Sequence, residues 1–120
     1  MPFKTLLTEL VAATPGARSA ILADWEGEAV ELACSSDNEY ELKLLAAHQV
    51  IIIGQVREVN DRLFGAHSSD LVITTGAGRC IVGTVGTDYS LVMTLHRDTS
   101  VGRALHRFRN TRNQLMKEIY

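Results

Sequence analysis

Residues 39–64 read EYELKLLAAHQVIIIGQVREVNDRLF, a run with no proline and a single glycine, Gly54. Leucine, alanine, glutamate and glutamine dominate its first half, and these residue types have high helix propensity. Asn60-Asp61 and then Phe64-Gly65 weaken the pattern and end it. The sequence therefore predicts one long central helix from Glu39 to Phe64.

This helix carries more apolar surface than one buried face requires. At 100° per residue, one broad face is expected to pack on the rest of the domain: Leu42, Leu45, Ala46, Gln49, Ile52, Ile53, Val56, Val59 and Leu63. Roughly opposite lies a second stripe, joined by Gly54 and edged by His48, Gln55 and Glu58: Tyr40, Leu44, Ala47 and Ile51. Leaving Leu44 or Ile51 in water forgoes roughly 1.5–3 kcal/mol each. We expect a second protein chain to cover this stripe, with another part of the same chain as the alternative.

The flanking segments predict the remaining elements. The apolar spacing from Phe3 to Val11 predicts a first helix, which ends at Pro15-Gly16. The same spacing from Val101 to Ile119 predicts a last helix, and Thr99 or Ser100 is expected to cap its N-terminus. Strand-like composition separated by turn residues predicts five strands, at 17–24, 28–34, 70–75, 79–85 and 89–95. The expected order of elements is αββαβββα.

The strands are apolar on both faces. Leu71, Val72 and Ile73 are consecutive, as are Leu91, Val92 and Met93, whereas a sheet with one solvated face would alternate. We therefore predict an α/β (α+β) fold, a five-stranded antiparallel sheet with helices on both faces. A length of 120 residues suits a single domain spanning 1–120.

Composition limits the classes of function. No signal peptide and no run of roughly 20 apolar residues is found, so we expect a cytoplasmic protein without a membrane span. Cys34 and Cys80 have no metal-binding spacing and are expected to be reduced core thiols. Residues 1–41 hold eight acids against two bases, a net charge of −6, and residues 97–118 hold six bases against two acids, a net of +4. This polarity could orient a protein partner, or form two solvated surfaces.

The motifs of common chemistry are missing. Gly76-Ala77-Gly78 and Gly83-Thr84-Val85-Gly86 lack the lysine and the helix start of a phosphate-binding loop, so we interpret them as strand turns or bends. The four histidines lack metal-ligand spacing. The pI near 6.0 argues against nucleic acid as the main partner. We predict no catalytic residue, no metal and no cofactor.

Several short stretches resemble the roadblock/dynein light chain family, and most closely its bacterial MglB-like members. They are Leu6-Leu7-Thr8-Glu9-Leu10 before Pro15-Gly16, Ala20 to Asp24 running into Trp25-Glu26-Gly27, and the helix around Ala46-Ala47. The resemblance covers essentially the whole chain. It implies a homodimer in which the third strands join edge to edge and the central helices pack side by side.

The same resemblance implies that this chain is a homodimeric regulator of a small Ras-like GTPase, stimulating hydrolysis without an arginine finger of its own. A non-catalytic structural adaptor in a larger complex is the alternative, and a small-molecule sensor is a third. The expected partner-binding and dimer residues come from the central helix and the third strand: Tyr40, Leu44, Ala47, His48, Ile51, Gly54, Gln55, Leu71, Val72 and Ile73.

Overall fold

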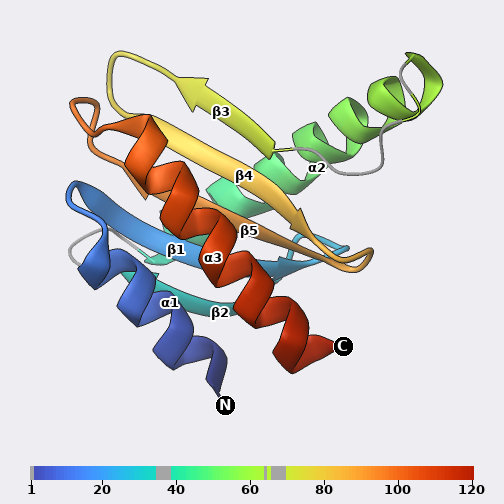
Figure 1. Ribbon diagram of the computed structural model, residues 1–120. Helices are drawn as coiled ribbons and strands as arrows, with labels where there is room; N and C mark the ends of the chain where they lie inside the picture. The colour runs from blue at the N-terminus through green and yellow to red at the C-terminus, as the bar shows by residue number, and fades with distance from the viewer. Residues whose placement is uncertain (1, 35–38, 64, 66–69) are drawn as a thin grey trace.

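The computed structural model describes residues 2–34, 39–63, 65 and 70–120 (Figure 1). Its elements confirm the predicted order. They are α1 (Pro2–Ala13), β1 (Ala17–Asp24), β2 (Ala29–Cys34), α2 (Glu39–Leu63), β3 (Asp70–Thr74), β4 (Arg79–Val85), β5 (Tyr89–Leu95) and α3 (Val101–Ile119). The predicted last residue of the central helix, Phe64, lies outside the described residues.

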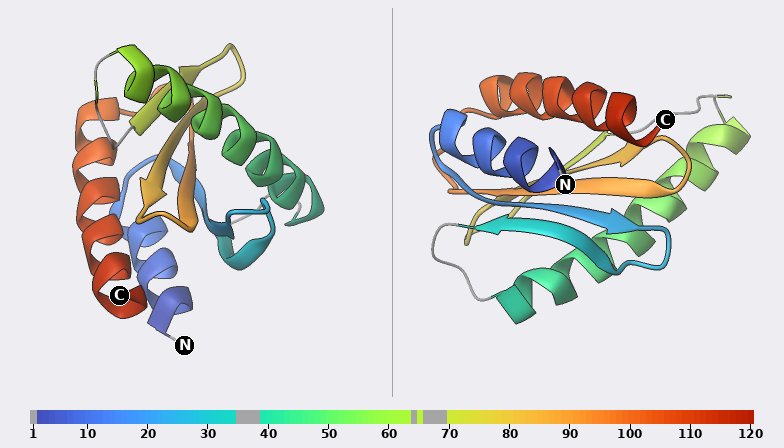
Figure 2. Two further views of the ribbon diagram at one scale, coloured as in Figure 1. Left: turned by 90° about the vertical axis from the view of Figure 1, so that its right-hand side faces the viewer. Right: turned by 90° about the horizontal axis from the view of Figure 1, so that it is seen from below.

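The five strands form one antiparallel sheet in the order β2-β1-β5-β4-β3. Figure 2 shows three layers, with α1 and α3 side by side on one face of the sheet and α2 crossing the other face. The predicted sandwich is therefore confirmed. It leaves β2 and β3 as the two edges of the sheet.

Each face of the sheet has its own hydrophobic core, which explains the consecutive apolar residues in the strands. Toward α1 and α3, Leu7, Leu91, Met93 and Phe108 are fully buried. Toward α2, Ile21, Val82 and Val92 are fully buried. Because neighbouring residues of a strand point to opposite faces, Val92 serves one core while Leu91 and Met93 serve the other.

Local hydrogen bonds set the strand boundaries. One carboxylate oxygen of Asp24 accepts the amides of Glu26 and Glu28, each at 3.0 Å, and Gly27 adopts a φ of +88°. Glu28 is thereby part of the turn, and β2 begins at Ala29, one residue later than predicted. Thr75 likewise leaves β3, because its hydroxyl accepts the amides of Ala77 and Gly78.

Candidate protein-binding surface

Helix α2 crosses the sheet diagonally, and its C-terminal half projects beyond the sheet, past the start of β3 (Figure 1). The buried residues of α2 all lie before its last ten positions: Leu42, Ala46, Gln49 and Ile53. Beyond Ile53 no residue of α2 is fully buried. The helix thus presents surface that the described part of the chain leaves uncovered.

The stripe opposite the core, which we call the outer stripe, consists of Tyr40, Leu44, Ala47 and Ile51. Tyr40 is 75% exposed, Leu44 49% and Ile51 59%. Ala47 is half-buried because Gly27 of the β1–β2 turn lies against it; a Cβ at Gly27 would be 3.1 Å from the Cα of Ala47. His48, Gly54 and Gln55 are exposed beside the stripe. The structure therefore places all seven helical candidates on or beside one outward surface.

The assignment of Ile52, Val59 and Leu63 to the sheet was wrong. Their exposed fractions are 37%, 51% and 69%, and they form a second apolar line that we call the flank. Periodicity gives the direction in which a side chain points, but it does not tell how far the sheet extends beneath the helix. Because α2 outruns the sheet, its last turns have nothing to pack against within the described residues.

The first turns of α2 also border a shallow apolar cavity of about 420 Å³, whose lining includes Gly27, Ala29, Tyr40, Leu44 and Ala47. Trp25, at the tip of the β1–β2 turn, is 70% exposed. The predicted partner-binding residues do not include Trp25. The sequence did contain a signal for this position, because tryptophan is enriched at protein interfaces.

The three strand candidates divide between the faces of β3. Leu71 and Ile73 are half-buried and pack into the core beneath α2, whereas Val72 pairs with Ile81 and is 37% exposed on the other face. Among the described residues, strand β3 pairs with β4 alone. Its other edge offers backbone N–H and C=O groups to a further strand.

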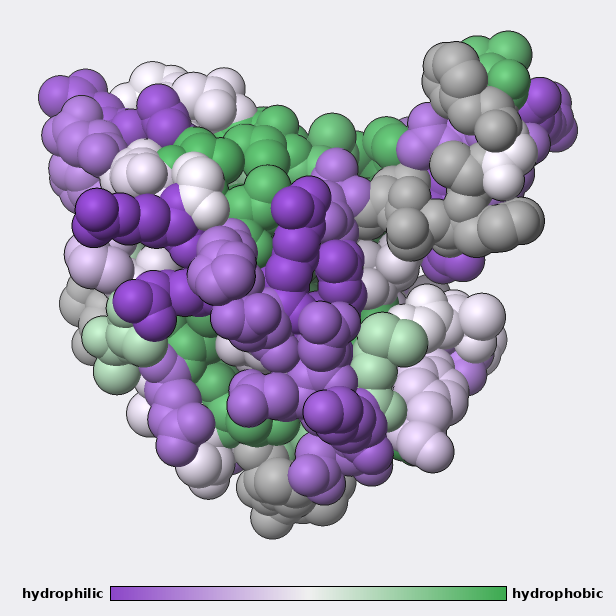
Figure 3. Space-filling view, viewed as in Figure 1, coloured by the Kyte–Doolittle hydropathy of each residue, from purple (hydrophilic) through white to green (hydrophobic). Residues whose placement is uncertain are grey.

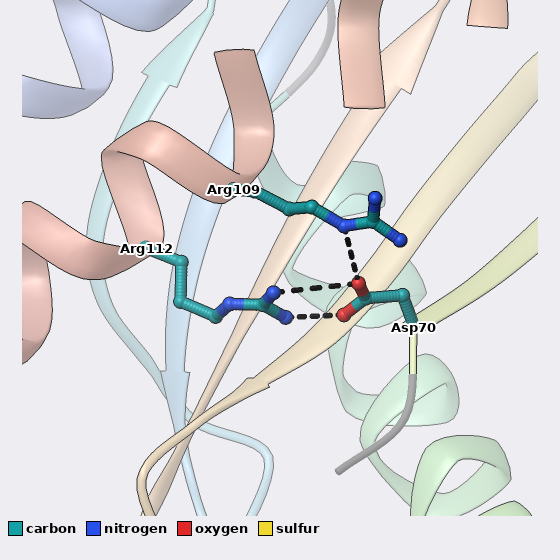
Figure 4. Close-up of polar contacts among 3 residues, drawn as sticks. All are labelled: Asp70, Arg109 and Arg112. Atoms are coloured by element: carbon teal, nitrogen blue, oxygen red, sulfur yellow. Dashed lines mark hydrogen bonds and ion pairs between the residues drawn. The ribbon is translucent and has the colours of Figure 1, made fainter. Parts of the chain in front are cut away.

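Asp70 fixes the start of this edge strand to α3 (Figure 4). Arg109 Nε donates to Asp70 Oδ2 at 3.0 Å, and Arg112 donates to both carboxylate oxygens. The side chains of Asp70 and Arg112 are only 14% and 16% exposed, and the Arg112 guanidinium lies 5.8 Å from the centre of the Phe108 ring. The start of β3 is therefore held in place before any partner binds. Sequence reasoning missed this cluster, because it joins residues about 40 positions apart.

The surface opposite α2 has a different character. Figure 3 shows hydrophilic side chains over α3, and Arg103, Arg107 and Lys117 are exposed there. Within residues 2–34, 39–63, 65 and 70–120, no group of three or more His, Cys, Asp or Glu side chains could hold a metal ion. No helix among these residues has the length and apolar character to cross a membrane. Cys80 is buried and Cys34 is partly buried, and no disulfide joins them.

A three-layer domain with this strand order, with β3 at one edge of the sheet and an apolar α2, has the roadblock fold. The resemblance in the sequence is confirmed at the level of the fold. The roadblock/LC7 domain from Streptomyces avermitilis superimposes with a TM-score of 0.87 at 16% identity, covering 97% of this chain and 96% of that one. MglB from Myxococcus xanthus gives 0.88 at 16% identity, covering 99% and 95%. An MglB described as having a tetrameric arrangement gives 0.86 at 18% identity, covering 96% and 85%. No protein-family model and no curated protein matches the sequence.

Proposed function

We propose that this protein is a homodimeric regulator of a small Ras-like GTPase, which it binds and whose GTP hydrolysis it stimulates. The observation that carries the proposal is the exposure of the outer stripe on a fold shared with MglB. Three large apolar side chains that point away from the core favour burial against another protein. Tyr40, Leu44 and Ile51, which the helical spacing predicts to face another chain, are the exposed large side chains of this stripe.

The dimer would form along β3 and the neighbouring part of α2. The unpaired edge of β3 is already ordered by Asp70, so a second β3 can add to it without first paying to organise the strand. Leu71, Val72 and Ile73 supply that edge. The flank residues Ile52, Val59 and Leu63 lie on the half of α2 that projects past the sheet, where a second α2 would cover them.

The regulator would act by shifting the conformation of the GTPase. It would bind the hydrolysis-competent state of the switch regions more tightly than the other states, because only such differential binding changes their populations. The chemistry would remain with the GTPase. We therefore assign no catalytic residue to this chain.

Single-turnover GTP hydrolysis by a Ras-like GTPase encoded beside this protein tests the proposal. We expect the rate to rise with added protein and to saturate. If the purified protein binds that GTPase but leaves the rate unchanged, the regulator hypothesis fails and the structural adaptor is supported. The adaptor is the second candidate because an apolar surface of this kind can anchor a complex without altering chemistry.

Two substitutions test the outer stripe. Leu44→Glu and Ile51→Glu each put a charge at an exposed apolar position, so the monomer should keep its fold while binding to the GTPase or to a second copy weakens at least about tenfold. Circular dichroism and thermal melting check the fold. Gln114→Glu on α3 is the matched control, since it adds the same charge at an exposed position on the opposite face of the sheet. Equal binding by all three variants would remove the outer stripe from the interface.

A further inference from the structure

The sheet has two edges, and the proposed dimer uses only one of them, β3. The other edge is β2, which pairs with β1 alone among the described residues. An uncovered edge strand presents backbone N–H and C=O groups that can pair with a further strand. A dimer joined through β3 would carry β2 at both ends, so an open β2 edge would let dimers add to one another without limit.

Only a short part of β2 is regular enough to accept a strand. Its register with β1 passes from Leu22–Glu31 to Ala23–Ala29, which leaves Val30 as an extra residue in β2. Such a bulge disrupts the ladder and increases the local twist. The register is unbroken only over the last four residues of the strand. In an antiparallel pair, alternate residues direct both backbone groups away from the partner strand, so few outward groups remain for an incoming strand.

Leu32 lies in this regular segment, and both of its backbone groups bond to side chains, which marks it as one of the outward residues. The Leu32 amide donates to Glu31 Oε1 at 3.2 Å, and the Leu32 carbonyl accepts from Lys4 Nζ of α1. The two side chains are themselves paired, because Lys4 Nζ lies 3.8 Å from the same Glu31 oxygen. A donor and an acceptor that a new strand would need are therefore already occupied.

Charged side chains flank this edge from both helical layers. A shallow cavity of about 160 Å³ lies beside β2, and its lining includes Lys4 from α1 together with Glu39 and Lys43 from the first turns of α2. An incoming strand would have to displace Lys4 and desolvate these charges, which opposes pairing. Edge lysines and bulges are two of the features by which proteins prevent strands of different molecules from joining.

Strand β3 has the opposite character. Its five residues keep an unbroken register with β4. Its one charged residue, Asp70, is turned toward Arg109 and Arg112 of α3 and away from the free edge. The two edges of the sheet thus differ: β3 is regular and its charge is held by α3, whereas β2 is bulged and its outward groups at Leu32 are bonded.

We infer that Lys4 and Glu31 close the β2 edge to another strand, so that copies of this chain join through β3 alone. The consequence, that assembly stops at two copies, rests on the proposed β3 dimer. The closure itself does not, because its contacts lie within one chain. The side chains of Lys4 and Glu31 are 57% and 30% exposed, so their ion pair adds little to the stability of the fold. Its role is to decide which edge is available.

Lys4→Met tests the inference, because it removes the charge and the donor and keeps an unbranched side chain on α1. Sedimentation equilibrium over a range of concentrations measures the particle mass. We expect the wild type to stay at twice the chain mass of 13.2 kDa. The variant should rise with concentration to at least about twice the wild-type mass, since whole dimers add through β2. Glu31→Val should do the same from within β2, and it remains informative if Lys4→Met weakens α1.

Two controls separate edge opening from loss of charge. Lys117→Met makes the same change at an exposed position of α3 and should keep the wild-type mass. Lys4→Arg keeps a charged donor and should also keep that mass. Circular dichroism and thermal melting check that each variant is folded. Hydrogen exchange measured by mass spectrometry should show residues 29–34 more protected in the Lys4→Met assembly than in the wild type, because the new strand pairs there.

Three results would overturn the inference: a Lys4→Met mass equal to the wild-type mass at every concentration, equal growth of Lys117→Met, or growth without added protection of residues 29–34. A failure of the proposed function looks different, because the wild type itself would then be monomeric. In that case closure of β2 predicts that Lys4→Met converts the monomer into a dimer, and a variant that stays monomeric would overturn the closure as well.

Discussion

At the residue scale, Gly83 is where the smallest change should have the clearest effect. A Cβ at this position would lie 2.6 Å from Asp70 Oδ1 and 2.8 Å from Phe108 Cε1. Gly83→Ala should therefore destabilise the domain by about 1–3 kcal/mol, since a well-packed core does not accept an extra methyl group. Denaturant unfolding measures the difference. Gly102→Ala is the control, because no atom lies within 4 Å of its Cβ and alanine favours helices; a loss of stability there as large as at Gly83 would contradict the packing argument.

Asp70 allows a comparison of two ion pairs in one molecule. Asp70→Asn removes the charge that Arg112 faces at 16% exposure, and we expect a loss of about 1.5–3 kcal/mol in the free energy of unfolding. Glu58→Gln breaks the pair with Arg62, in which both side chains are more than 60% exposed, and should cost no more than about 0.5 kcal/mol. Urea titrations of the two variants give the comparison. Similar losses would mean that burial does not strengthen the Asp70 cluster.

The two thiols should differ in reactivity. Burial raises the pKa of Cys80 from 9.0 to about 12 because desolvation disfavours the thiolate, so at pH 8 only about one molecule in ten thousand carries it. The shift is upward in the folded state, and stability that is fully present below pH 9 is lost as the pH rises toward 12. Iodoacetamide at pH 8 followed by mass spectrometry should label Cys34 well before Cys80. Equal labelling of both in the folded protein would contradict the burial of Cys80.

At the element scale, the two apolar lines of α2 should have separable roles. Val59→Glu alters the flank, so we expect it to weaken self-association at least about tenfold while the isolated domain keeps its melting behaviour. Analytical ultracentrifugation of Val59→Glu beside Gln114→Glu measures the effect. Self-association that survives Val59→Glu but not Leu44→Glu would place the second copy on the outer stripe instead.

Elements were predictable where local signals suffice. The ends of the helices and strands are set by turn residues whose effect is confined to a few positions: Pro15-Gly16, Asp24 with Gly27, and the glycines between the last strands. The outer stripe was predictable because a helix repeats every 3.6 residues. The flank and the Asp70 cluster were not, since each depends on how the fold places segments that are distant in sequence relative to one another.

At the scale of the whole molecule, the decisive quantity is the size of the particle in solution. One copy has a Cα radius of gyration of 13.2 Å, and its principal extents are 39 × 35 × 26 Å. Joining two copies through β3 would make a continuous ten-stranded sheet, which is longer than it is wide. A compact particle of twice the residues has a radius of about 18 Å, and an elongated dimer must exceed that value. Small-angle scattering at micromolar concentration should therefore give a radius of gyration of at least about 18 Å. A radius near 13 Å that does not change with concentration would show that the protein is a monomer, and it would remove the dimer from the proposal.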